Sequence, residues 1–295
     1  MAPKRPCSLS AAGRRTLRIR PSLFSVRRGD EKSFYDFRER GLFWGHDGLY
    51  FFVMDFSGNE KRDVLEDFRP YLSPTVIIDS DHPEVREFAS AVAPGAEDPT
   101  NIAVRLYYAV RDSIRYDPYT PFHRPEDYRA SMVLRRKRSF CIPKASLLCA
   151  LGRARGIPAR VGFATVRNHL ATKQLLDFFG SEIFVWHGFV EFFLNGQWVK
   201  ATPAFNRELC ERHRVPPLDF NGREDSIFQP YNLENRKFME YLSFHGIYSD
   251  IPVDEIVAGW TKAYGEERIQ NWIRMYEDKE QRGLRDFDKE DVWKG

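Results

Sequence analysis

Apolar side chains recur at helical spacing between residues 81 and 156, which predicts three helices. The first begins after Asp81 and the second at Asp98. The third runs from about Cys141 to Gly156. Aspartate near a helix start accepts hydrogen bonds from unpaired backbone N–H groups, and glycine commonly ends a helix. Each predicted helix therefore has a start or stop signal that agrees with its apolar periodicity.

Beyond residue 156 the pattern changes to short runs of β-branched and aromatic residues, which predicts strands. They cover about 160–166, 183–194 and 197–201. The second and third are separated only by Asn195-Gly196, the residue pair that favours a two-residue hairpin turn. These segments should form an antiparallel sheet.

The hairpin fixes which residues of the two strands lie opposite each other. Leu194 then faces Gln197, and Glu191 faces Lys200 as a cross-strand ion pair. Continued along the strands, this register makes Thr202 a diagonal neighbour of His187, within reach of a side chain.

Helices followed by a helix packed on an antiparallel sheet make an α+β fold. We expect three parts: a basic, flexible extension over 1–65, a core over 66–230, and a C-terminal helical segment over 231–295 that packs on the core. The last part contains two helical patterns, around Trp260 and Trp272.

Charge is unevenly distributed along the 295 residues. Residues 1–30 carry +7 and the rest −4, within a net charge of +3. This Arg- and Ser-rich, acid-poor arm is typical of a disordered segment. Its composition also overlaps that of a mitochondrial transit peptide. A further alternative is that the natural protein starts at Met54. Because the core is mildly acidic, we expect nucleic-acid binding only weakly and through the arm.

Several other classes of protein are excluded by composition. No apolar run approaches 18 residues, so we expect no membrane span. The four Cys are scattered and form no C-x-x-C, so neither a disulfide framework nor a zinc site is predicted. We expect no metal and no cofactor, and a reducing, cytoplasmic location.

Two residues are candidates for chemistry. Cys141 lies at a predicted helix N-terminus, where unpaired N–H groups and the helix dipole favour a thiolate, although most free cysteines are small core residues. His187 lies in an apolar strand, beside Gly188. With Thr202 orienting the imidazole, the three residues would supply a nucleophile, a base and an orienting group.

The run from Cys141 to Arg160, ending in Gly-Ile-Pro-Ala-Arg, resembles the Cys-helix motif of the transglutaminase-like superfamily. The stretch 186–203 resembles its His and third-residue strands, and 107–116 its preceding helix. The resemblance covers about residues 70–230 and includes bacterial transglutaminase-like proteins. It implies a papain-like transglutaminase core, in which a helix bearing the Cys packs on an antiparallel sheet.

The resemblance also implies a Cys-His-Asp triad, with Cys141 as nucleophile and His187 as base. The third position departs from the family, because Thr202 stands where Asp is usual; Asn206 or Asp219 could orient the imidazole instead. The implied function is cysteine-dependent acyl transfer or amide hydrolysis on peptide or protein substrates through a thioester. The alternatives are a cysteine peptidase or amidase, and a non-catalytic binding module.

Overall fold

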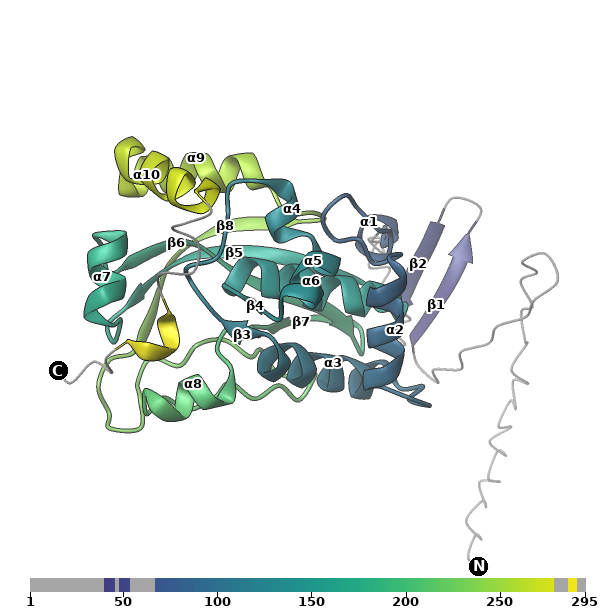
Figure 1. Cartoon of the computed structure of the whole chain (residues 1–295). Coiled ribbons are helices and arrows are strands. Elements are labelled where there is room, and N and C mark those ends of the chain that lie inside the picture. Colours follow the sequence, from purple (N-terminus) through teal and green to yellow (C-terminus); the bar gives the residue numbers. More distant parts are fainter. Residues whose placement is uncertain (1–39, 46–47, 54–66, 279–285, 291–295) are drawn as a thin grey trace, which may run out of the picture.

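A central helix packed on a four-stranded antiparallel sheet organises the molecule (Figure 1). The computed structural model describes residues 40–45, 48–53, 67–278 and 286–290. The predicted α+β class and the predicted arrangement of helix and sheet are confirmed.

The central helix, α6 (Cys141–Ala154), is buried on all sides. Every residue from Ile142 to Arg153 is buried, which is the pattern of a helix enclosed by other elements. One side of α6 packs on β5 (Ala159–Asn168) and β6 (Ile183–Leu194). The other side contacts helices that precede it in the chain: α1 (Arg69–Leu72), α2 (Pro83–Val92), α3 (Pro99–Ser113), α4 (Pro125–Tyr128) and α5 (Ala130–Arg136).

The predicted helix starts are close to those observed. Asp98 caps α3, its carboxylate accepting from the N–H of Asn101 at 2.8 Å. Helix α2 begins at Pro83, but its capping residue is His82 rather than Asp81. Its ring Nδ1 accepts from the N–H of Glu84 at 3.3 Å.

The sheet has the order β7-β6-β5-β8, and its hairpin has the predicted register. In that hairpin, β6 pairs with β7 (Gln197–Ala201). Glu191 lies opposite Lys200, and their charged groups are 3.7 Å apart. Glu191 is nevertheless buried, and its closer partner is Arg160 of the neighbouring strand at 2.7 Å. The carboxylate is thus held inside the sheet rather than in solvent.

The C-terminal segment differs from the helical prediction in one element. Strand β8 (Met239–Tyr248) precedes the two helices α9 (Val253–Tyr264) and α10 (Glu266–Glu277) and forms one edge of the sheet. The pairing of β8 with β5 shifts register twice, and most of its middle is exposed. These features blur the alternation of apolar and polar residues that identifies a strand.

The remaining elements are short. They are β1 (Arg40–Gly45) and β2 (Gly48–Val53), which form a hairpin, β3 (Arg115–Tyr116) and β4 (Arg138–Ser139), which pair in parallel, α7 (Lys173–Phe179), α8 (Arg207–Arg212) and the 3₁₀ turn η1 (Phe287–Lys289). The hairpin lies within the predicted extension 1–65, whose other residues are outside the described ranges. No helix in the described part of the chain is long and apolar enough to cross a membrane.

Candidate active site

Cys141 is the first residue of α6, and nearby backbone N–H groups favour a negative charge on its sulfur. The N–H groups of Gly188, Ile142 and Cys141 itself all interact with Sγ. Pro143 has no N–H, and the N–H of Lys144 is used by the carbonyl of Phe140 at 3.2 Å. The helix therefore directs its first two N–H groups at the sulfur.

These donors do not hold the thiol ionised. Burial raises the pKa of Cys141 to about 11, although the three N–H groups and the charge of Lys144 act to lower it. The side chain lies where two hydrophobic clusters meet and keeps partial exposure through a cavity. At neutral pH the free protein thus carries a protonated thiol that remains accessible.

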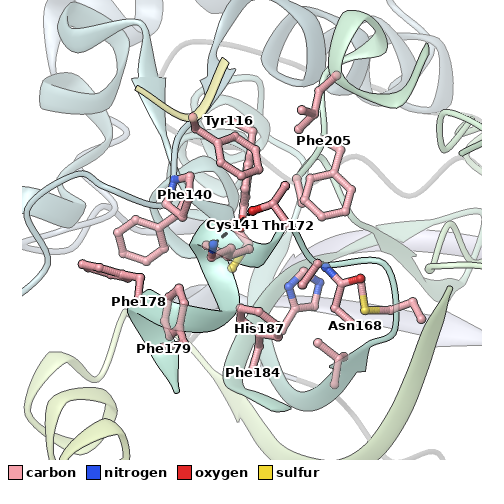
Figure 2. Close-up of a pocket in the computed structure, with 18 of the residues that line it drawn as sticks. Tyr116, Phe140, Cys141, Asn168, Thr172, Phe178, Phe179, Phe184, His187 and Phe205 are labelled. Atoms are coloured by element: carbon pink, nitrogen blue, oxygen red, sulfur yellow. Dashed lines mark hydrogen bonds between the residues drawn. The ribbon is translucent and has the colours of Figure 1, made fainter. Parts of the chain in front are cut away.

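His187 enters the same cavity from β6 (Figure 2). A bulge in the pairing of β5 with β6 and a left-handed φ of 62° at Trp186 precede it, and together they turn the strand at this point. The ring packs 4.9 Å from Phe228 and 6.4 Å from Tyr241 between centroids. Burial lowers the pKa of His187 to about 3, so the imidazole is neutral at rest.

Thr202 lies just beyond the end of β7 and is 1% exposed. Its hydroxyl has no hydrogen-bond partner, and neither has Nε2 of His187, although both atoms are buried. The predicted hydrogen bond between them is therefore not formed. Tyr241 approaches Thr202 without reaching hydrogen-bond geometry.

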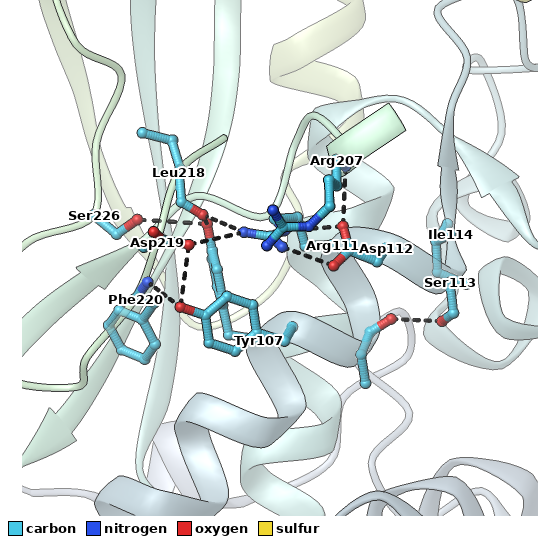
Figure 3. Close-up of polar contacts among 12 residues, drawn as sticks. Tyr107, Arg111, Asp112, Ser113, Ile114, Arg207, Leu218, Asp219, Phe220 and Ser226 are labelled. Carbon is cyan, nitrogen blue, oxygen red and sulfur yellow. Dashed lines mark hydrogen bonds and ion pairs between the residues drawn. The ribbon is translucent and has the colours of Figure 1, made fainter. Parts of the chain in front are cut away.

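The two other candidates for the third position are used elsewhere. Asn206 accepts from the backbone N–H of Tyr116 at 3.1 Å and begins helix α8. Asp219 is mostly exposed and pairs with Arg111 at 3.3 Å (Figure 3). Neither residue lines the cavity that contains Cys141 and His187.

The hydrogen bonds of Tyr107 and Arg111 hold the backbone at Thr202 and Leu218 in place. The Tyr107 hydroxyl lies 3.2 Å from the carbonyl oxygen of Thr202. It lies 2.9 Å from the carbonyl oxygen of Leu218 (Figure 3). Arg111 donates to the same Leu218 carbonyl at 2.7 Å. Helix α3 thus fixes the backbone of Thr202 while its side-chain hydroxyl stays unpaired.

Lys144 is a buried residue of the site that the sequence prediction missed. Its ammonium donates to the carbonyls of Arg111 at 2.9 Å and Ile114 at 2.5 Å, at the C-terminal end of α3. Burial lowers the pKa of Lys144 to about 7. The available signal was a lysine one turn after Cys141 in an otherwise apolar helix.

The cavity has an internal volume of about 100 Å³ and opens to solvent at its mouth. Its aromatic wall comes from α7, α9 and α10, with Phe287 of the C-terminal turn closing another side. Within the described ranges, no group of His, Cys, Asp or Glu residues is placed to hold a metal ion.

Cys141, at the N-terminus of α6, and His187, on the antiparallel strand β6 that packs against this helix, thus line the same cavity. Residues 86–203 match the model of the transglutaminase-like superfamily, which confirms the resemblance predicted from the motifs. The match ends one residue after Thr202, so the C-terminal wall of the cavity lies outside it.

Solved structures similar to the chain include a "putative cysteine protease" from Cytophaga hutchinsonii and the periplasmic domain of TgpA from Pseudomonas aeruginosa. The first is 16% identical with a TM-score of 0.38, and covers 63% of this chain and 55% of its own. The second is 19% identical with a TM-score of 0.33, and covers 45% of each chain. The chain thus spans about half the length of these structures. No curated protein matches it.

Proposed function

We propose that the protein is a cysteine-dependent enzyme that transfers or hydrolyses the acyl group of peptide or protein substrates through a thioester. One observation carries this proposal: Cys141, at the N-terminus of α6, lines the same cavity as His187. A cysteine kept only for packing needs neither the helix N-terminus nor the opening.

The reaction would begin with transfer of the thiol proton to His187 as the sulfur attacks the substrate carbonyl. The new C–S bond gives a tetrahedral oxyanion, which the backbone N–H of Cys141 can stabilise. The imidazolium then gives its proton to the leaving amine, the C–N bond breaks and a thioester remains. Water releases the acyl group as an acid, whereas an amine releases it as a new amide.

A non-catalytic binding module is the second candidate function, and the residue at position 202 supports it. A neutral hydroxyl at Thr202 cannot stabilise an imidazolium as a carboxylate does, and here it does not contact the ring. We therefore expect slower catalysis than a complete triad gives.

Intact-protein mass spectrometry after mixing with p-nitrophenyl acetate tests the proposal. We expect one acetyl group on the wild type and none on Cys141→Ala. Cys149→Ala is the matched control, since Cys149 lies two turns along the same helix and is fully buried. It should acetylate like the wild type.

The dependence on His187 is tested by the pH profile of alkylation with iodoacetamide. The wild type should react faster than His187→Gln near neutral pH, because the ring accepts the thiol proton. Identical profiles for the two folded proteins, together with no acetylation, would leave the binding module as the function.

A further inference from the structure

The cavity beside Cys141 is lined without charge. Among the described residues that form its walls there is no Asp, Glu, Lys or Arg. This is unusual for a space that reaches solvent, because charged side chains are common at protein surfaces. The cavity therefore has no partner to offer a charged group of a substrate.

One side of the cavity is an aromatic chamber, defined by Phe178, Phe179, Trp260, Tyr264 and Trp272. Phe178 stacks on Trp272 with ring centroids 4.5 Å apart and planes at 12°. Phe179 packs edge-on against Tyr264 at 5.3 Å and against Trp272 at 5.2 Å. The rings support one another and form a rigid wall.

The polar groups of Trp260 and Tyr264 in this chamber are already occupied. The indole N–H of Trp260 donates to the carbonyl of Val185 at 3.0 Å. The Tyr264 hydroxyl donates to the carbonyl of Ile183 at 3.2 Å and accepts from the N–H of Val185 at 3.0 Å. Because these atoms bond the backbone of β6, the chamber presents mainly hydrocarbon to a ligand.

From these observations we infer that the aromatic chamber binds a bulky apolar side chain, aromatic or aliphatic, of the residue whose carbonyl Cys141 attacks in a peptide substrate. This inference rests on the proposed function and assigns its substrate class. A carboxylate or ammonium in the chamber would lose its hydration with no compensating partner. An apolar side chain would instead gain by leaving water.

The test compares acylation by p-nitrophenyl esters of N-acetylated Leu, Phe, Ala and Glu. The burst of p-nitrophenol gives kcat/KM for acylation of the wild type. We expect the Leu and Phe esters to exceed the Ala ester on the order of tenfold or more, since each buried methylene adds several-fold. The Glu ester should be slower than the Ala ester.

A pair of variants on α7 locates the preference. Phe179→Glu places a charge in the chamber, whereas Leu176→Glu changes a partly buried residue of the same helix that does not line the cavity. The preference for Leu over Ala should fall severalfold in Phe179→Glu and persist in Leu176→Glu. If Phe179→Glu does not fold, Phe179→Ala should reduce the preference for the Phe ester.

The outcomes separate the inference from the proposed function. Acylation at equal rates by all esters, or fastest by the Glu ester, would overturn the inference and keep the function. Fastest acylation by p-nitrophenyl octanoate would assign the chamber to a fatty acyl chain and refute the peptide assignment.

If no ester acylates the protein, the proposed function fails. In that case, quenching of tryptophan fluorescence in Cys141→Ala by N-acetyl-Phe amide, but not N-acetyl-Glu amide, would still support the chamber's selectivity, and equal quenching would refute it.

Discussion

Acidification should destabilise this protein through His187. The unfolded chain has an ordinary histidine with a pKa of 6.5, whereas burial lowers the pKa of His187 to about 3 in the folded protein. Between these values the unfolded state binds a proton that the folded state does not. The contribution of His187 to stability is therefore complete above about pH 6.5 and falls as the pH drops toward 3.

The size of the effect follows from the two pKa values. Linkage gives a loss of about 2 kcal/mol between about pH 7.5 and pH 5, and about 4 kcal/mol once the pH reaches the folded value. Such a loss is a large part of the stability of an ordinary domain, which is about 5–15 kcal/mol. The effect is well above the error of a denaturation experiment.

Urea unfolding of the wild type and His187→Gln, followed by tryptophan fluorescence, measures this loss. The free energy of unfolding of each protein is determined at several values between about pH 7.5 and pH 5, and the variant is subtracted from the wild type. His213, whose pKa burial lowers to about 4, is present in both proteins and cancels. We expect the wild type to lose about 2 kcal/mol relative to the variant.

The sign of the difference reports the resting state of the site. A thiolate paired with an imidazolium would raise the pKa of His187 in the folded protein, so that the wild type would gain stability relative to the variant on acidification. A difference of that sign, or one within about 0.5 kcal/mol of zero, would refute the neutral pair deduced from burial.

Three further changes give distinct outcomes. Thr202→Asp should raise the pKa of the imidazole and speed acylation by about tenfold or more. Thr202→Val should acylate at the wild-type rate, because the hydroxyl that it removes is unpaired. Coinciding pH–rate profiles for the wild type and both variants would contradict this expectation. Gly188→Ala would place a Cβ 3.0 Å from Cα of Ile142, so the free energy of unfolding should fall by about 1–3 kcal/mol. Urea unfolding measures this loss, and an unchanged unfolding midpoint would contradict the close packing. Phe287→Ala removes a buried ring from the cavity wall, so alkylation of the Cys141 thiol should accelerate. The free energy of unfolding should fall by about 3 kcal/mol. An unaltered alkylation rate would show that the ring does not limit access to the thiol.

The parts of the fold that were predictable depend on interactions between residues close in sequence. Asp98 caps the helix that begins next to it, and the turn at Asn195-Gly196 sets the pairing of the strands on either side. Such signals are encoded within a few residues, so they can be interpreted without knowledge of the rest of the molecule. The predictions of α3, α6 and the hairpin succeed for this reason.

The parts that were missed depend on contacts between distant residues. Strand β8 exists because β5 presents a free edge about 80 residues earlier in the chain, despite two register shifts in their pairing. Lys144 is buried because the end of α3 supplies two carbonyl oxygens. The aromatic chamber requires α9 to pack against β6 and α10 to pack on α9. Neither periodicity nor capping signals contain this information.

The sequence proposes Cys141 and His187 by residue type, but their protonation depends on how deeply the fold buries them. Taken separately, the pKa values of about 11 for Cys141 and about 3 for His187 oppose transfer of the proton by about 11 kcal/mol. Both shifts therefore favour a neutral thiol and a neutral imidazole before substrate binds. In the proposed mechanism, proton transfer therefore accompanies attack on the carbonyl, when the negative charge moves from sulfur to the oxyanion and its N–H donors. In that mechanism a carboxylate in place of Thr202 would favour the imidazolium at this step, which is why Thr202→Asp is the variant expected to accelerate acylation.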